Sequence, residues 1–474
     1  MTFVGDSRFH VLGEHEIERI HQASLAILER TGIAVDHPEG RDLLRSAGAW
    51  VDGRVVHIPP QMVETALKAA PHSITLFNRQ GKPSVILQAG HVNFLSHSDG
   101  PSIVDFHARE KRPFTSKDGA DAIRVADSLP NIDVIGLVGA YSDVPPEIAG
   151  RTAYAQGLRL TGKPITCAVD SRAELEGVLE MAACVAGGFK ILREAPQMVL
   201  STGPTSPLVI PFYTVEHLFR CAELGVPAFS GSMPCLGATG PVTMAGNVAL
   251  GNAESLASVV LSQLKQPGAP VILGGFSIAM DMRTMLFCYG APESSLMVAA
   301  WTDMATHYDL PMWGTAGCTD SKIVDEQAVL ESGMQCLLAL LSGASLVHDV
   351  GLIESGKAMS LEMMVLADES IAHAKRIAQG VLVDDASLAL ETIHRVGPGG
   401  DFLAEEHTLS HFRQIWVPRL LDRSKREQWS AAGGLSLAER AARRTQAILE
   451  DHHPAPLPAR VLAELKHLSE TWVA

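Results

Sequence analysis

The sequence predicts an α/β fold, a (β/α)8 TIM barrel with an N-terminal helical and β-hairpin extension and C-terminal helices. Three observations lead to this prediction. From residue 116 onward, apolar runs of strand length alternate with helical segments. Several of these runs are apolar throughout, as expected for parallel strands covered on both faces. Eight such units follow one another in roughly 250 residues, the usual size of a closed barrel.

The N-terminal segment, residues 1–115, is expected to form the helical and β-hairpin cap. Residues 14–30 place apolar side chains at helical spacing after an acidic start, and shorter helices are expected at 37–47 and 60–70. Residues 74–116 alternate apolar and polar side chains between turn pairs, which favours antiparallel hairpins.

The barrel is expected within residues 116–380. Its strands are predicted at residues 131–139, 164–171, 197–204, 226–232, 269–276, 285–290, 311–317 and 344–351. Its helices are predicted at residues 147–161, 173–188, 212–225, 243–265, 293–307, 325–342 and 360–379. The alternative is an open doubly wound sheet, which usually carries a Gly-rich phosphate loop after its first strand. The stretch GAYSDVPPE follows the first predicted strand and lacks that pattern.

The C-terminal segment, residues 381–474, is expected to be a helical extension that packs on the barrel exterior or on a second subunit. It is charged, has a Gly-rich break at 396–409, and ends in an amphipathic helix stopped by prolines. Its apolar helices suggest a homo-oligomer. No metal site is predicted, because His452 and His453 have no third ligand nearby in the sequence.

Composition narrows the class of partner. The formal net charge of −15 repels phosphate backbones, so nucleic acid is not an expected partner, whereas a cationic small molecule suits this charge. The seven cysteines are scattered without a CxxC spacing, which points to neither a disulfide framework nor a zinc ribbon and fits the cytoplasm. The longest apolar run is broken by Lys265, Pro267 and Pro270, so no membrane-spanning helix is expected.

Polar groups concentrate between Pro311 and Gly351, where a strand, a polar turn, a helix and a second strand follow one another. The ends of barrel strands are where such an enzyme places its active site. The turn contains Cys318, Asp320 and Lys322, and His348 and Asp349 end the second strand.

Three motifs resemble the trimethylamine methyltransferase family, in its branch lacking pyrrolysine. They are GTAGCTDSKIVDEQ (314–327), GPGGDFLAEEHTL (397–409) and GPSIVDFHAREKRPFTSKD (100–118). The resemblance covers nearly the whole chain. It implies a (β/α)8 barrel whose members move a methyl group from a methylated amine to Co(I) of a corrinoid (cobalamin) on a separate protein. It also places the pyrrolysine position of the relatives in or near the turn at Cys318, and an ordinary residue there argues against trimethylamine.

The resemblance therefore implies a quaternary amine as substrate, most simply glycine betaine, with carnitine and proline betaine as alternatives. Such a transfer is an in-line displacement with a neutral tertiary amine, dimethylglycine for glycine betaine, as leaving group. It needs no general acid, so the protein must orient the substrate, tolerate a cation and exclude water. Each cation–aromatic contact contributes about 0.5–2 kcal/mol.

Asp320 and His348 are the candidate catalytic residues, and Asp320 has the alternative role of capping the helix at 325–342. Asp320 and Lys322 could position the substrate or contact the corrinoid. A betaine carboxylate could be bound by Lys322, by His348 or by free backbone amides at the start of this helix. Glu354 could face the cation, and Cys318 could line the pocket. The candidate aromatic side chains, each with core packing as its alternative role, are Phe94, Tyr141, Phe276, Tyr289 and Trp313.

Two other functions stay open at this stage. One is a barrel lyase or aldolase with Lys322 as a Schiff-base residue, which requires that lysine to be buried at a strand end. The other is a non-catalytic quaternary-amine binding protein. Fold alone does not decide among these functions.

Overall fold

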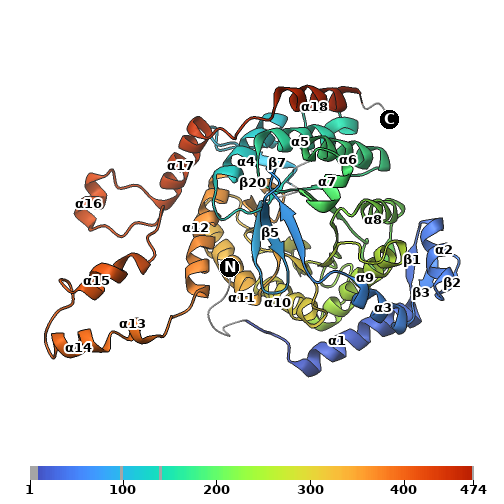
Figure 1. Cartoon of the computed structure of the whole chain (residues 1–474), viewed down its shortest axis with the longest axis horizontal. Coiled ribbons are helices and arrows are strands. Elements are labelled where there is room, and N and C mark those ends of the chain that lie inside the picture. Colours follow the sequence, from blue (N-terminus) through green and yellow to red (C-terminus); the bar gives the residue numbers. More distant parts are fainter. Residues whose placement is uncertain (1–8, 97–99, 138–140, 472–474) are drawn as a thin grey trace.

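The computed structural model describes residues 9–96, 100–137 and 141–471. At its centre, eight parallel strands form a barrel (Figure 1). From the second strand to the last, each strand pairs with the next in chain order, and the last pairs with the first. The first and second strands are joined only by an isolated bridge between Leu95 and Val134. The strands are β6 (Asn93–Ser96), β9 (Ile135–Gly136), β10 (Ile165–Ala168), β11 (Met198–Thr202), β13 (Ala228–Ser230), β14 (Val271–Gly274), β17 (Met312–Thr315) and β18 (Leu346–Val350).

A helix follows each barrel strand and covers the outside of the ring, so the predicted (β/α)8 fold is confirmed. These helices are α4 (Ser116–Ser128), α5 (Pro146–Leu160), α6 (Arg172–Ala186), α8 (Phe212–Leu224), α9 (Met244–Lys265), α10 (Pro292–His307), α11 (Glu326–Ser342) and α12 (Leu361–Ala378). The short helix α7 (Phe189–Glu194) follows α6.

Two strand assignments from the sequence were wrong. The first barrel strand is β6, which the alternating pattern of 74–116 had grouped with the cap hairpins. The stretch 285–290 is not a barrel strand, because β16 (Leu286–Cys288) pairs antiparallel with β15 (Ala279–Asp281) in a hairpin between β14 and α10. A hairpin and a barrel strand share the same local pattern, and only pairing distinguishes them. Residues 138 and 139 of the predicted strand at 131–139 lie outside the described residues.

The segment before β6 packs against one side of the barrel. Helices α1 and α3 lie on α9, and β1 pairs in parallel with β12 (Val209–Ile210) from the loop between β11 and α8. The barrel thus takes its first strand from within residues 1–115, while the domain limits at 115 and 380 stay a prediction. The elements of this segment are α1 (Glu14–Ala26), the π-helical turn η1 (Ile27–Thr31), β1 (Ile33–Val35), α2 (Pro38–Ser46), β2 (Trp50–Asp52), β3 (Val55–His57) and α3 (Pro60–Ala69).

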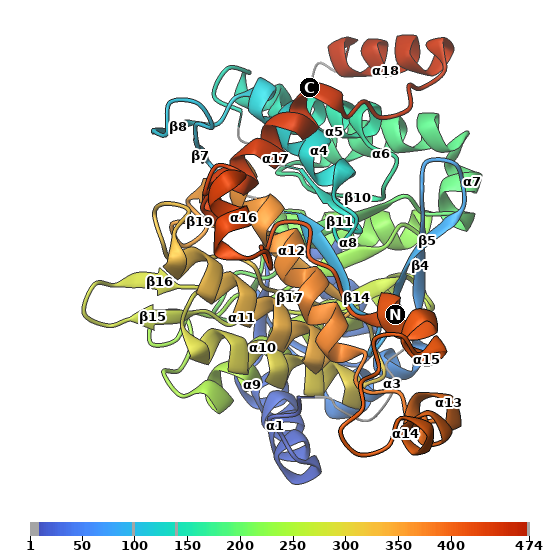
Figure 2. The same ribbon diagram turned by 90° about the vertical axis from the view of Figure 1, so that its left-hand side faces the viewer.

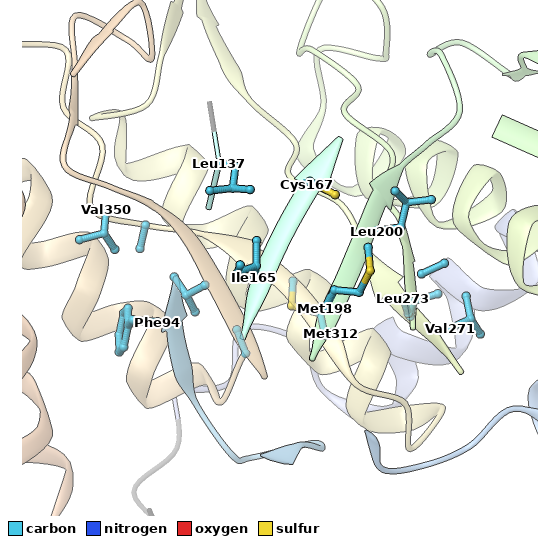
Figure 3. Close-up of a cluster of buried hydrophobic side chains, with 14 of the residues drawn as sticks. Phe94, Leu137, Ile165, Cys167, Met198, Leu200, Val271, Leu273, Met312 and Val350 are labelled. Carbon is cyan, nitrogen blue, oxygen red and sulfur yellow. The ribbon is translucent and has the colours of Figure 1, made fainter. Parts of the chain in front are cut away.

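Alternate residues of each barrel strand face opposite sides of the sheet, which separates two cores. On β11, Met198 and Leu200 belong to the outer cluster beneath the helices, whereas Val199 belongs to the inner one. On β17, Met312 faces outward and Trp313 inward. Figure 3 shows outer-cluster members on β6, β10, β11, β14, β17 and β18.

A hairpin of β4 (Ile74–Phe77) and β5 (Pro83–Leu87) closes the end of the barrel where the strands begin, and it lies across the ring in Figure 1. Its residues Ile74, Leu76 and Leu87 pack in the inner cluster with side chains of the barrel strands. The interior is therefore filled from this end, and the opposite end is left for chemistry.

Three hairpins surround the end of the barrel where the strands finish, and Figure 2 shows them on its left-hand side. One is β15–β16. The others are β7 (Ser102–Val104) with β8 (Lys111–Pro113), and β19 (Leu352–Ile353) with β20 (Ala358–Met359), joined by pairing of β20 with β7. We refer to this end as the mouth.

The C-terminal segment returns to the barrel through its last two helices. Helix α17 packs on α12 and α4, and α18 packs on α5 and α6. Among the described residues, no helix is both long enough and apolar enough to cross a membrane. The elements of the segment are α13 (Asp385–Leu388), α14 (Leu390–Val396), α15 (Glu406–His411), the 3-10 turn η2 (Phe412–Gln414), α16 (Arg426–Ala431), α17 (Leu437–Asp451) and α18 (Ala459–Thr471).

Replacing Leu87 by alanine is expected to lower the stability of the fold by about 2–5 kcal/mol, because its fully buried side chain fills the closed end of the barrel. Thermal unfolding measures this loss. Ile86→Ala is the matched control, since Ile86 is the next residue of the same strand and is 43% exposed. Equal losses in the two variants would contradict the role given to the hairpin.

Candidate functional site

Aromatic side chains gather inside the barrel toward its mouth. Phe229 on β13, Trp313 on β17 and Phe276, two residues after β14, belong to or pack against the inner cluster. His348 on β18 contacts two of these rings, and Asp349 follows it. We call these five residues the mouth cluster.

The rings of the mouth cluster form a continuous chain of contacts. Phe229 stacks on Trp313 with ring centroids 4.2 Å apart, and its ring lies 6.4 Å from that of Phe276. The imidazole of His348 lies 4.6 Å from Phe276 and 5.5 Å from Trp313. Such a group of aromatic faces attracts a cation through the quadrupoles of the rings.

A β-bulge places Asp349 beside this group. In the pairing of β18 with β6, Val347 is opposite Phe94 and Val350 is opposite Ser96, so two residues of β18 stand against one of β6. Asp349 has a φ of 80°, an uncommon value for a residue other than glycine. Bulges of this kind redirect side chains near active sites, and this one brings the carboxylate of Asp349 next to His348.

Hydrogen bonds to neighbouring strand residues fix the orientation of both side chains of the pair. His348 Nδ1 lies 2.8 Å from the carbonyl oxygen of Gly314, which only accepts, so Nδ1 carries a proton. His348 Nε2 lies 3.3 Å from Asp349 Oδ1, and Thr315 Oγ1 donates to Asp349 Oδ2 at 2.5 Å. The contact between Nε2 and Oδ1 is an ion pair when the imidazole is protonated.

Part of the mouth is open to solvent. Ala168 ends β10 and is exposed, although the three preceding residues of the strand are buried. By strand alternation it faces inward, since Ile165 and Cys167 belong to the outer cluster. Phe276 is also partly exposed. A small molecule can thus approach the mouth cluster from this side.

The polar turn after β17 is fixed by two residues of α11 that are one helical turn apart. Gln335 donates from Nε2 to the carbonyl oxygens of Tyr289 (3.0 Å) and Cys318 (2.7 Å), and it accepts from the Gly317 N–H. Glu331 accepts from the Asp320 N–H at 2.8 Å and from the Thr319 hydroxyl. This turn is a rigid support beside the mouth.

Asp320 joins three loops at the mouth. Its carboxylate accepts hydrogen bonds from the N–H groups of Tyr289 (2.9 Å) and Gly290 (3.0 Å) and from the Ser355 hydroxyl (2.8 Å). Burial raises its pKa above the ordinary value for aspartate. Asp320 does not cap α11, because the capping side chain is Asp325, which accepts from the Ala328 N–H. These hydrogen bonds hold the loops at Tyr289 and Ser355 together, and Tyr289 takes part in this network through its backbone.

The structure does not place the other turn residues in the mouth cluster. Cys318 is buried in the outer cluster, and burial raises the pKa of its thiol far above the ordinary value, so it is not a reactive thiolate. Lys322 is exposed, and its Nζ donates to the carbonyl oxygen of Asp320 at 2.8 Å. An exposed lysine does not meet the requirement of the Schiff-base alternative.

Three further candidates also lie elsewhere. Phe94 is fully buried on the outer side of β6, where Lys375 of α12 lies over its ring. Tyr141 packs between helices, covering Gly119 of α4 and donating to Gln156 of α5 at 2.9 Å. Burial raises its pKa.

Glu354 pairs with Lys111 of β8 at 2.7 Å and does not face the mouth cluster. It follows the short strand β19 in the loop that leads to α12, so a position in the last loop of the barrel did not guarantee a position inside it.

Sequence reasoning missed Phe229, Thr315 and Asp349 as members of the site. Phe229 is a single aromatic between small residues of a buried strand, and Thr315 lies two residues after Trp313 on the same strand face. Both could have been found from the strand alternation. The position of Asp349 at the end of its strand was clear from the sequence, but the direction of its side chain was not, because a bulge depends on the pairing partner. Among residues 9–96, 100–137 and 141–471, no group of three or more His, Cys, Asp or Glu side chains is arranged to hold a metal ion.

Comparison with known proteins identifies the family. The family described as trimethylamine methyltransferase (MTTB) matches residues 3–471. This chain belongs to that family. The resemblance of the three sequence motifs is therefore confirmed.

Curated relatives carry two different substrate names. A trimethylamine methyltransferase MttB of Desulfitobacterium hafniense is 35% identical over 459 residues, covering 96% of this chain and 92% of the relative. A glycine betaine methyltransferase from another strain of that species is 30% identical over 462 residues, covering 97% of this chain and 96% of the relative. Among solved structures, the Methanosarcina barkeri monomethylamine methyltransferase (MtmB) has a TM-score of 0.53 at 12% identity, covering 96% of this chain and 90% of that one, which supports the fold.

Replacing Asp320 by alanine is expected to lower stability by about 1–3 kcal/mol, because it leaves the N–H groups of Tyr289 and Gly290 without their acceptor. Thermal unfolding and limited proteolysis of the 281–290 segment measure the effect. Glu326→Ala is the control, since Glu326 follows Asp320 at the start of α11 and is exposed. An Asp320→Ala protein as stable as this control would contradict the role of Asp320 in holding these loops together.

Proposed function

We propose that this member of the methyltransferase family takes a methyl group from a small quaternary amine, most simply glycine betaine, and passes it to Co(I) of a corrinoid held on a partner protein. The observation that carries the proposal is the mouth cluster, in which Phe276 and Trp313 contact His348 of the His–Asp pair and Phe229 contacts both of these rings. Aromatic faces and one carboxylate suit a cationic headgroup. The released product is a tertiary amine, dimethylglycine for glycine betaine.

The chemistry of the transfer explains why the cluster contains few polar groups. Co(I) supplies the nucleophile, and the neutral amine leaves without being protonated, so this chain needs no general acid. Its residues orient the methyl group and exclude water. The positive charge of the substrate disappears during the reaction, so binding it too tightly would slow the step. Rings and a carboxylate already shared with His348 provide moderate attraction.

One polar atom supports a substrate with a carboxylate. Trp313 is 1% exposed, and its Nε1 has no hydrogen-bond partner in the described part of the chain. A buried N–H without an acceptor is costly, by roughly 1–3 kcal/mol. The carboxylate of a betaine can accept from such a donor, whereas trimethylamine has no carboxylate. The relatives are named for both substrates, and a hydrogen bond from Trp313 Nε1 to a substrate carboxylate would favour a betaine over trimethylamine.

The proposal is tested by mixing the protein with reduced cobalamin and one amine at a time, and then with a corrinoid protein. Conversion of the Co(I) absorption band to that of methyl-Co(III) is expected with glycine betaine and not with trimethylamine. Conversion with trimethylamine alone would overturn the choice of substrate. No conversion with any amine, repeated with a corrinoid protein, would overturn the methyl transfer to Co(I).

Two variants connect this assay to the mouth cluster. Phe276→Leu removes one cation–aromatic contact and is expected to lower kcat/KM for the amine by about 2- to 30-fold, equivalent to about 0.5–2 kcal/mol. Tyr141→Phe is the control, because Tyr141 packs between α4 and α5. Equal effects in the two variants would contradict the placement of the amine.

The rim of the mouth has an apolar surface on which a protein partner could dock. Exposed apolar side chains lie on the β15–β16 hairpin and on the loop after β13, and Met282 of the hairpin lies against Gly237 of that loop. Contiguous exposed apolar surface marks interaction sites, and methionine adapts to a partner's shape. The residues of this rim patch are Met233, Val242, Met244, Met282, Met285, Leu286 and Phe287. A corrinoid protein docked here would present its cobalt to the mouth.

Replacing Met285 and Phe287 together by glutamate is expected to raise the KM for the corrinoid protein by about tenfold or more, because charge in an apolar interface weakens docking. The Kd for the amine, measured by calorimetry, is expected to stay within about twofold of wild type, because the hairpin lies outside the mouth cluster. An unchanged KM for the corrinoid protein would contradict docking at the rim patch.

A further inference from the structure

One segment of the chain stands away from the rest. No residue from 379 to 419 is buried, and α13, α14 and α15 all lie within this segment. Figure 1 shows these helices projecting from the barrel beside α12. We call residues 379–419 the arm.

The arm is rich in apolar side chains that contact little of their own chain. Leu403 is 88% exposed, Val417 76% and Leu409 73%. The remaining exposed apolar residues of the arm are Val381, Leu382, Val383, Leu388, Leu390, Ile393, Phe402, Phe412 and Ile415. Monomeric proteins rarely expose apolar residues in such a group, so this surface indicates a binding partner.

Isolated helices of this length are not stable. Helices α13, α14 and α15 have 4, 7 and 6 residues, whereas a free helix shorter than about 12–15 residues is marginal in water. Their stability must come from packing their apolar side chains against another surface. In the described chain, Trp416 of the arm stacks on His373 of α12 with ring centroids 5.1 Å apart, but no barrel helix packs extensively on α13, α14 or α15.

Both ends of the arm are anchored. At its start, Arg376 donates to the Gly380 carbonyl oxygen. At its end, Glu369 of α12 accepts from the N–H groups of Arg419, Leu420 and Leu421, the first two at 2.9 and 3.0 Å. The arm is thus an excursion that leaves from the end of α12 and returns to the same helix.

If the corrinoid partner docks at the mouth, as proposed above, it does not cover the arm. In Figure 2, α13, α14 and α15 lie at the lower right, whereas the β15–β16 and β7–β8 hairpins of the mouth lie on the left. A protein docked at the mouth would not reach α13–α15.

The same chain offers a second uncovered apolar surface. A groove of about 340 Å³ runs between the outer faces of α11 and α12, and Leu421 and Leu437 of the C-terminal segment line one side of it. Its apolar lining from the two helices includes Leu330, Met334, Leu337 and Ile377. Leu330 is 66% exposed, Met334 51% and Ile377 50%. The outer faces of barrel helices are normally polar because they meet water. An apolar groove at this position therefore also needs a cover.

We propose that the arm of one chain lies in the α11–α12 groove of a second copy, and that the second arm occupies the groove of the first. In a two-fold symmetric dimer, each arm covers the groove of the other chain, so the same arm–groove contact forms twice. A stable interface uses roughly 20–30 residues on each side, and the arm is long enough to supply them. No third protein is needed, because the arm and its complement lie on one chain.

The test measures molar mass in solution by light scattering or native mass spectrometry on the full chain. The wild-type protein is expected at an even multiple of 50.6 kDa. An arm variant, Leu403→Glu with Leu409→Glu, is expected to raise the Kd of the pair by at least about tenfold. A groove variant, Leu330→Glu with Met334→Glu, is expected to have the same effect. Leu286→Glu, an exposed leucine at the opposite end, is the matched control and should leave the mass unchanged.

Each result decides the proposal. A wild-type monomer at micromolar concentration would overturn it. Dissociation by the arm variant but not by the groove variant would overturn the choice of groove, and dissociation by Leu286→Glu as well would overturn the specificity. Circular dichroism of each variant verifies that it is folded. If the arm variant fails to fold, deletion of 382–417 with a short Gly-Ser linker replaces it, because that deletion leaves the contacts of Glu369 in place.

Discussion

Closing eight parallel strands into a ring is the constraint on which the rest of this structure depends. In a closed parallel barrel every strand finishes at the same rim, and alternate residues face inward or outward. One residue of β17 therefore packs beneath a helix while its neighbour Trp313 faces the interior. The β4–β5 hairpin fills one end of that interior, so the aromatic rings meet at the other.

A local departure from this regular pattern provides the charge of the site. The bulge in β18 turns Asp349 toward His348 and Thr315, and this geometry requires the neighbouring strands β6 and β17 on either side. Around it, Gln335, Glu331 and Asp320 hold the surrounding loops through backbone hydrogen bonds. The polar residues that looked catalytic in the turn thus support the site, and the carboxylate beside the aromatic rings comes from the strand.

Sequence reasoning located part of this site. Phe276, Trp313 and His348 were predicted, and they lie together because each occupies an inward position near the end of its strand. Phe94 was also near a strand end, but one position out of phase, and that difference places its ring beneath α12. Tyr141 lies beyond the end of β9, and its side chain packs between α4 and α5. A one-residue shift reverses the direction of a side chain, so proximity to a strand end was not sufficient.

The sequence by itself determined the barrel, the alternation of strands and helices, and the family, because apolar periodicity and extended motifs are properties of neighbouring residues. Tertiary structure alone decided which segment supplied the first strand, since β6 and β16 have similar local patterns and differ only in their pairing partners. It also decided the mouth cluster, whose members come from β13, β14, β17 and β18, and the exposure of the arm. These features depend on contacts between distant residues, which no local pattern encodes.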